Sequence, residues 1–155
     1  MKRVELEPEA VRRLKNSGWE PGRNVQHLVD AWVEQLKSMP DGPQFSEPPE
    51  AVIEMLREFG GLHVRVAGPG RTMMRYPFTL DPRKGLLSPA AYAQLSQQAG
   101  SATYPLGVLY GEESAIAGDA QGRVLLITSI GPMIEGIDIH DALNHMILGV
   151  RPENL

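Results

Sequence analysis

The sequence contains no cysteine. This absence excludes disulfides, thiolate metal sites and thiol nucleophiles, together with the cysteine-containing zinc signature of nucleobase deaminases. Long apolar runs are also missing, since none reaches the roughly 18 residues of a membrane span. Acids interrupt residues 1–7, where a signal peptide needs an apolar segment. We therefore expect a cytoplasmic protein that does not associate with a membrane.

Basic residues are scarce in the second half of the chain. Residues 1–75 carry 11 basic and 11 acidic side chains, whereas residues 76–155 carry 4 and 8, so the net charge of −4 arises entirely in the second half. Phosphate binding relies on clustered Lys and Arg, which makes nucleic acid a poor partner for this half. A protein with a basic surface is the better match.

Length and overall composition are those of an ordinary folded domain. The chain has 155 residues, of which 42% are hydrophobic and 22% are charged. A chain of this length buries most of the surface that its unfolded state exposes, so one hydrophobic core is expected. We predict a single domain that covers residues 1–155.

Five segments carry helical signals: apolar residues at helical spacing, proline or a capping residue at the start, and glycine at the end. They are residues 8–18, 24–36, 46–60, 88–100 and 138–149. Asn24, Ser88 and Asp138 are the expected N-caps. We expect Gly60 to adopt the left-handed conformation that ends the third helix, and Gly61 to allow a tight turn into the next strand.

Six segments have the apolar patterns of strands. They are residues 62–66, 76–80, 106–110, 114–117, 124–128 and 129–137. Pro77 favours an edge position for the second of these strands, because proline cannot donate to a ladder. Residues 68–75 are expected to form a loop. The elements do not alternate as βαβ, so we predict an α+β fold, a mainly antiparallel sheet of about five to six strands with helices packed on it.

No residue pattern supplies a complete catalytic or metal site. Residues 66–72 resemble a phosphate loop, but Arg65 and Arg71 stand where that loop requires glycine and lysine. His140 and His145 are five positions apart, about 140° around a helix, whereas metal-binding pairs use a four-residue step. We expect both on a solvated helix surface. No serine lies in a nucleophile motif, and we expect neither a cofactor nor a bound metal.

Four short motifs occur in a fixed order along the chain. They are residues 18–23 (GWEPGR), 56–62 (LREFGGL), 104–107 (YPLG) and 119–124 (DAQGRV). Together they resemble the SUKH superfamily, specifically its third group of immunity proteins, over residues 14–149. Trp19 and Phe59 are expected in or near the core, and Arg23 is expected to pair with a carboxylate or to cap a helix end.

The resemblance implies a SUKH-like fold that binds and neutralises a cognate toxin of a bacterial polymorphic toxin system. Such toxins are often nucleases or deaminases that act on nucleic acid, which agrees with the acidic second half of the chain. The resemblance implies no cofactor and no catalytic residues. The expected function therefore depends on a surface that binds another protein.

The best candidates for partner contact combine an aromatic anchor with acids at strand ends. They are Tyr110, Glu112, Glu113 and Asp119. An ordinary solvated loop explains these residues equally well. Two other functions stay open: a small enzyme with an undetected site, for example in a cleft near residues 68–75, and a SUKH-like scaffold or regulatory protein without a toxin partner. No pattern indicates an oligomeric state.

Overall fold

The computed structural model describes residues 3–38, 45, 47–85, 87–111 and 113–155. Within these residues the helices are α1 (Pro8–Asn16), α2 (Gln26–Lys37), α3 (Glu50–Phe59), α4 (Pro89–Ala99) and α5 (Ile139–Leu148). The side chains of Ser88 and Asp138 accept hydrogen bonds from the third backbone N–H beyond them and cap α4 and α5, as predicted. The α3 helix starts four residues later than the predicted residue 46, because a residue that precedes proline is disfavoured in a helix.

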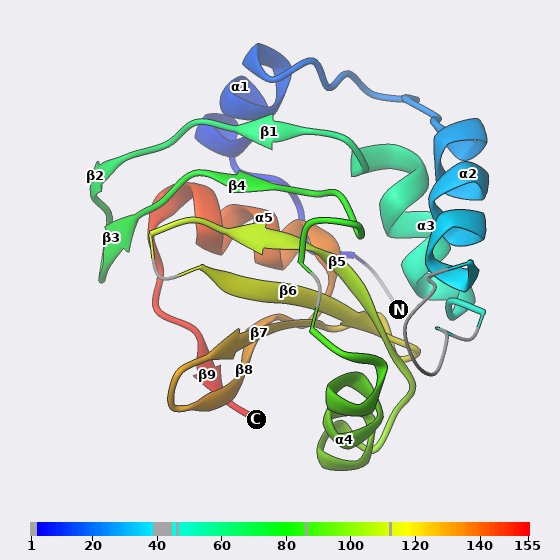
Figure 1. The fold of residues 1–155 in the computed structure, drawn as a ribbon. Helices are drawn as coiled ribbons and strands as arrows, with labels where there is room; N and C mark the ends of the chain where they lie inside the picture. Colours follow the sequence, from blue (N-terminus) through cyan, green and yellow to red (C-terminus); the bar gives the residue numbers. More distant parts are fainter. Residues whose placement is uncertain (1–2, 39–44, 46, 86, 112) are drawn as a thin grey trace.

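Seven strands form one antiparallel sheet in the order β1-β4-β5-β6-β7-β8-β9 (Figure 1). They are β1 (His63–Val64), β4 (Phe78–Thr79), β5 (Thr103–Leu109), β6 (Ser114–Asp119), β7 (Val124–Thr128), β8 (Gly131–Gly136) and β9 (Glu153–Asn154). A separate hairpin pairs β2 (Gly68–Pro69) with β3 (Met74–Arg75). The α+β prediction is confirmed, with slightly more strands than the five to six expected.

Two local predictions on the sheet are wrong. Strand β4 is not at an edge, because it pairs with β1 on one side and with β5 on the other. Pro77 is compatible with this position since it precedes the first residue of β4, and its carbonyl oxygen accepts a hydrogen bond from Tyr110 N. The expected loop at residues 68–75 contains the β2–β3 hairpin, whose two-residue strands are too short to give an alternating pattern.

The end of α3 differs from the prediction by one residue. Gly60 has φ −61° and ψ 143°, an extended conformation, and Gly61 takes the left-handed conformation with φ +85°. Gly60 is required for a different reason, since a Cβ there would lie 2.5 Å from Leu56 O and 2.7 Å from the Trp32 ring. The junction therefore needs two glycines, one for close packing and one for backbone geometry.

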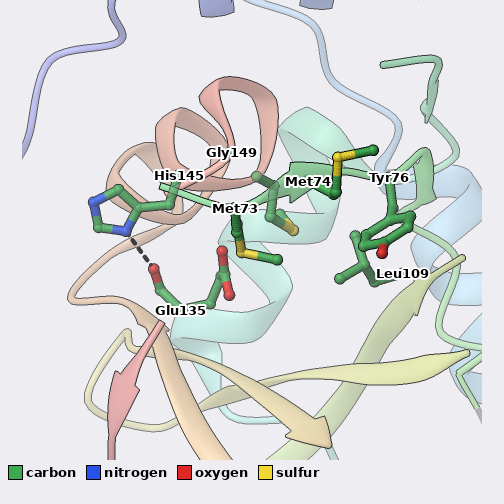
Figure 2. A pocket seen from close by; sticks show the side chains of 8 residues that line it. Met73, Met74, Tyr76, Leu109, Glu135, His145 and Gly149 are labelled. Atoms are coloured by element: carbon green, nitrogen blue, oxygen red, sulfur yellow. Dashed lines mark hydrogen bonds between the residues drawn. The ribbon is translucent and has the colours of Figure 1, made fainter. Parts of the chain in front are cut away.

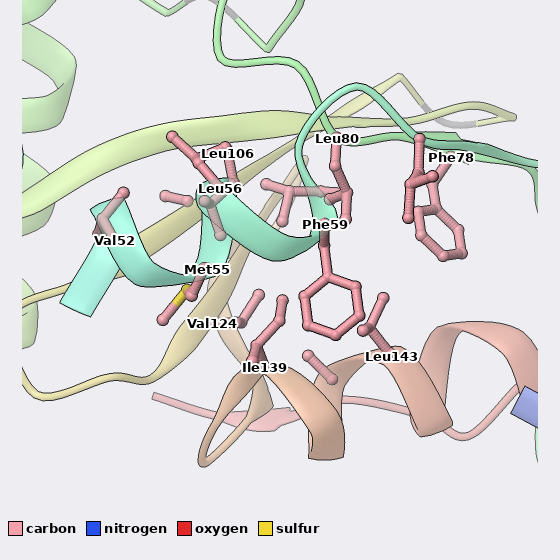
Figure 3. Close-up of a cluster of buried hydrophobic side chains, with 14 of the residues drawn as sticks. Val52, Met55, Leu56, Phe59, Phe78, Leu80, Leu106, Val124, Ile139 and Leu143 are labelled. Atoms are coloured by element: carbon pink, nitrogen blue, oxygen red, sulfur yellow. The ribbon is translucent and has the colours of Figure 1, made fainter. Parts of the chain in front are cut away.

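Helices α3 and α5 pack on one face of the sheet and enclose the largest part of the core. Figure 3 shows Phe59 of α3 directed toward Ile139 and Leu143 of α5. Leu106 and Val124 contribute from the strands, and all five of these side chains are buried. Helix α4 contacts β5 near the lower end of the sheet in Figure 1.

Most of the family motif at residues 18–23 holds the C-terminal end of α3. Trp19 is buried, stacks on Phe59 with a centroid distance of 6.0 Å, and donates from its indole N–H to Glu58 Oε2 over 3.1 Å. Arg23 donates to the backbone oxygen of Glu58 over 2.7 Å. This contact confirms the expected helix-capping role of Arg23, because carbonyls in the last turn of a helix lack partners within it.

The N-terminal segment is fixed by α5. Val4 N donates to Asp138 Oδ2 over 2.9 Å, and Glu7 N donates to Asn144 Oδ1 over 2.8 Å. The amide of the buried Asn144 donates in turn to Glu5 O over 2.9 Å. The chain therefore joins its first described residues to its last long helix before α1 begins.

Candidate partner-binding surface

A groove opens on the face of the sheet that α5 partly covers, beside β3 and the β7–β8 turn, and it encloses about 500 Å³. Leu109, Leu126 and Met133 line it from β5, β7 and β8. The remaining lining residues come from the segment around β3, the β7–β8 turn and the segment before β9. They are Met73, Met74, Tyr76, Thr128, Ser129, Ile130, Arg151 and Pro152. The groove thus borders residues 68–75, near which the sequence left open a cleft of an undetected enzyme.

The rim of the groove exposes large apolar side chains to solvent. Ile130 is 87% exposed and Met74 is 49% exposed. Single exposed apolar residues are common, but apolar groups gathered around a concave surface indicate a binding site. Methionine is unbranched and polarisable, so a surface that contains Met73, Met74 and Met133 can adapt its shape to a partner.

A narrow inner pocket continues from the groove toward the C-terminal end of α5 (Figure 2). Met73, Met74, Tyr76 and Leu109 line both spaces. The inner pocket is completed by Glu135, His145, Met146 and Gly149. Its free volume is about 10 Å³, roughly the space of one water molecule.

Glu135 is the unusual residue of the inner pocket. It is 3% exposed, and no hydrogen bond or ion pair of its carboxylate occurs among the described residues. Strand β8 contains a bulge here, since Leu125 pairs with Ile134 and Val124 pairs with Gly136, which leaves Glu135 without an opposite residue. Bulges re-aim side chains, and Figure 2 shows this carboxylate directed toward Met73.

The surroundings of Glu135 favour its protonated form. Burial is the main cause and the nearby carboxylate of Asp141 adds to it, and together they raise the pKa of Glu135 to about 8. A buried carboxylate without a positive partner loses its hydration and gains nothing in exchange. The pocket therefore contains an acid that a cation would stabilise in its charged form.

His145 is held by contacts at both ring nitrogens. Its Nδ1 lies 2.7 Å from Glu135 O, and its Nε2 lies 3.3 Å from Asp141 Oδ1. The contact of Nδ1 with the backbone of Glu135 ties α5 to β8. His140 Nδ1 lies 2.8 Å from Val4 O, and its ring meets the edge of Phe59. The expected solvated surface for His140 and His145 is wrong, because both are half-buried and bonded.

The predicted contact residues do not form one cluster. Tyr110 follows Leu109 and lies with His63 and Thr79, with its hydroxyl 3.2 Å from Thr79 Oγ1. Successive strand residues point to opposite faces, so Tyr110 lies on the face opposite the groove.

The turn that carries the predicted acids lies beside the groove. Glu113 is exposed and has an unusual φ of +52° for a residue other than glycine. Gly111 approaches the ring of Tyr76 so closely that a Cβ would collide with it. Because Tyr76 lines the groove, this turn forms part of the surroundings of the groove. Glu112 lies outside the described residues.

Asp119 is completely buried and its carboxylate is not available on the surface. It accepts hydrogen bonds from Gln121 N over 3.0 Å, from Arg123 N over 2.9 Å and from Arg123 Nε over 2.7 Å. Arg123 also donates to Ala99 O at the end of α4 over 2.7 Å. The motif at residues 119–124 therefore shapes the β6–β7 turn and ties it to α4.

Burial also changes the meaning of the acidic second half. Asp81, Asp119 and Glu135 are all 5% exposed or less, and Asp81 is paired with Arg83 over 2.8 Å. Asp138 and Asp141 are half-buried at the start of α5, whereas Glu153 is exposed like Glu113. The excess of acids counted in the sequence is thus largely internal, which weakens the inference of a broad acidic surface.

Sequence reasoning missed the groove and Glu135. The groove residues lie far apart along the chain, and the methionines gave no periodic pattern. The one available signal was Glu135 itself, an acid in a segment predicted as a strand with apolar neighbours. Only the register of β7 and β8 shows that this side chain points inward.

Comparison with known proteins places the chain in a family. Across the residues that the structure describes, no helix is long and apolar enough to cross a bilayer, and no three His, Asp or Glu side chains gather as metal ligands. No curated protein and no solved structure was found to match the chain. The family model described as SUKH-3 immunity protein matches residues 6–149, nearly the whole length. The chain therefore belongs to the SUKH-3 immunity protein family.

Proposed function

We propose that the protein binds a cognate toxin directly in the cytoplasm and thereby neutralises it. The observation that carries the proposal is the family match over residues 6–149, because an immunity protein implies a toxin to be resisted. The groove beside β3 offers the partner a concave apolar surface with adaptable methionine walls. The occupant of this groove is a protein surface of the toxin.

The toxin in this proposal is a nuclease or another enzyme that modifies nucleic acid. Such enzymes need basic substrate grooves, which exposed acids on an inhibitor complement. Two of its exposed acids support this choice, namely Glu113 in the turn beside the groove and Glu153 on β9, next to the groove residue Pro152. Glu112, the chain neighbour of Glu113, belongs to the same proposal, whereas Tyr110 lies on the opposite face of the sheet and would require a partner that reaches beyond the groove.

Introduction of two negative charges on the apolar rim of the groove tests the proposal. In cells that co-express the cognate toxin domain, the double variant Met74→Glu and Ile130→Glu should lose protection. Ile130 is 87% exposed and Met74 is about half exposed, so the fold should survive while an apolar contact is replaced by two charges. Binding should weaken by at least about tenfold, measured by calorimetry.

The matched control is Leu28→Glu, which makes the same kind of change at a 37% exposed leucine on α2. This variant should protect as well as the natural protein. Glu113→Lys tests the turn in the same assay and should slow association, an effect that salt reduces. Full protection by the groove double variant would refute the groove as the binding surface, and failure of the natural protein to bind the toxin would refute the function.

A further inference from the structure

The inner pocket pairs apolar walls with a carboxylate at its end. Met73, Met74, Tyr76 and Leu109 connect it to the wider groove, so a side chain that enters from the groove passes between apolar groups first. Glu135, His145 and Met146 line the inner pocket but not the groove. Apolar walls shared with the groove and one acid beyond them are the complement of a long apolar stem with a cationic head.

The carboxylate of Glu135 lacks what such a head would supply. The Glu135 residue as a whole is only 3% exposed, and no hydrogen bond or ion pair of its carboxylate occurs among the described residues. Its charged neighbour Asp141 has the same sign, and His145 faces it only through a contact with the backbone oxygen of Glu135. A positive group placed here would gain an ion pair in a site that has room for little water.

The size of the pocket selects among positive groups. Its free volume of about 10 Å³ holds only one water-sized group, so a lysine side chain enters only when the walls move apart, and a compact ammonium requires less displacement than a planar guanidinium. A metal ion is a poor fit because it needs several oxygen or nitrogen ligands, and both His145 ring nitrogens are already engaged. The walls include Met73, Met74 and Met146, whose flexible side chains can open around a four-carbon stem.

We propose that the inner pocket binds a lysine side chain of the partner, with the stem along the methionine walls and the ammonium on Glu135. This inference rests on the proposed function in that the lysine belongs to the toxin. An enzyme that acts on nucleic acid uses lysines to hold phosphates. Capture of one of them would place an essential group of the toxin inside its inhibitor.

A titration with n-butylammonium tests the pocket without the toxin. The protein is labelled at its methionine methyl groups and titrated at about pH 8.5, where Glu135 ionises readily and the amine is still charged. The resonances of Met73 and Met146 should shift and saturate. Butan-1-ol, which has the same stem and no charge, should bind at least about tenfold more weakly.

The Glu135→Gln variant should bind the amine and the alcohol equally well, because only the charge has been removed. Glu135→Met, which suits the apolar walls, provides a second neutral variant in case the amide perturbs the fold. The control Glu153→Gln removes an exposed acid on β9 and should keep the preference for the amine. Equal binding of both probes by the natural protein would overturn the lysine pocket, and so would an undiminished preference in Glu135→Gln.

Binding to the toxin domain separates this inference from the proposed function. Glu135→Gln should bind the toxin at least about 30-fold more weakly than the natural protein, since a buried charge pair loses one partner. Glu153→Gln should change the affinity little. If the natural protein binds and Glu135→Gln binds equally tightly, the lysine inference is refuted and the function stands. If the natural protein does not bind, the function is refuted, and the amine titration alone decides the pocket.

Discussion

The natural protein should lose stability as the pH rises, and the replacement of Glu135 by glutamine should abolish this pH dependence. The pKa of Glu135 is raised from 4.5 to about 8 by burial and by Asp141. Between these two pH values the folded protein holds the proton while the unfolded chain releases it. The free energy of unfolding therefore falls with rising pH across this window, because the folded state binds more protons than the unfolded state.

The magnitude follows from the size of the shift. One pKa unit corresponds to about 1.4 kcal/mol, so the shift from 4.5 to about 8 amounts to about 5 kcal/mol as an upper limit. Rearrangement of water and side chains around the charged form reduces this figure, and we expect about 3–4 kcal/mol. Glutamine has no charge to desolvate and should lack this part of the pH dependence.

Urea unfolding of both proteins at several pH values between about 5 and 9 measures the effect. The two proteins should have similar stability near pH 5, and Glu135→Gln should be the more stable one near pH 9. The comparison cancels all other titrating groups, which the two proteins share. Glu153→Gln, which changes an exposed acid, should follow the natural protein. Parallel curves for Glu135→Gln and the natural protein would refute the reasoning.

Three further substitutions test the packing of the fold by chemical unfolding. Gly60→Val should destabilise by at least about 2 kcal/mol, because the new side chain collides with the Trp32 ring and the α3 backbone. Gly61→Ala has space for its side chain but requires a positive φ, so it should cost only about 1 kcal/mol. A greater loss of stability in Gly61→Ala than in Gly60→Val would show that the junction is misassigned. Asp119→Ala should cost about 3 kcal/mol because Arg123 loses its buried partner, and a loss below about 1 kcal/mol would contradict that role.

Signals confined to one turn of chain were readable from the sequence. Ser88 and Asp138 cap their helices as predicted, and Gly100 takes the left-handed conformation after α4. Each of these depends on neighbours within a few residues, which the sequence displays directly. The fold class followed from the order of such elements.

Features that depend on strand register were not readable. Pro77 favoured an edge position for β4. In the structure β1 and β5 flank β4, because the β2–β3 hairpin, which lies between β1 and β4 in the chain, is not part of the main sheet. Asp119 was a candidate for partner contact and Glu135 counted toward the acidic second half, and only the folded sheet shows that each is buried. A one-residue change of register moves a side chain to the opposite face, so charge counts cannot tell a solvated carboxylate from an enclosed one.

The anchoring of the N-terminal segment determines when the protein can finish folding on the ribosome. The backbones of Val4, Glu5 and Glu7 bond to Asp138 and Asn144, which are made 134 to 139 residues later. Helix α1 has nine residues and is too short to be stable alone. Until α5 has emerged, these backbone bonds cannot form, and the segment stays more accessible to chaperones and proteases. We expect the N-terminal segment to become protease-resistant only in a late step, after α5 has been synthesised.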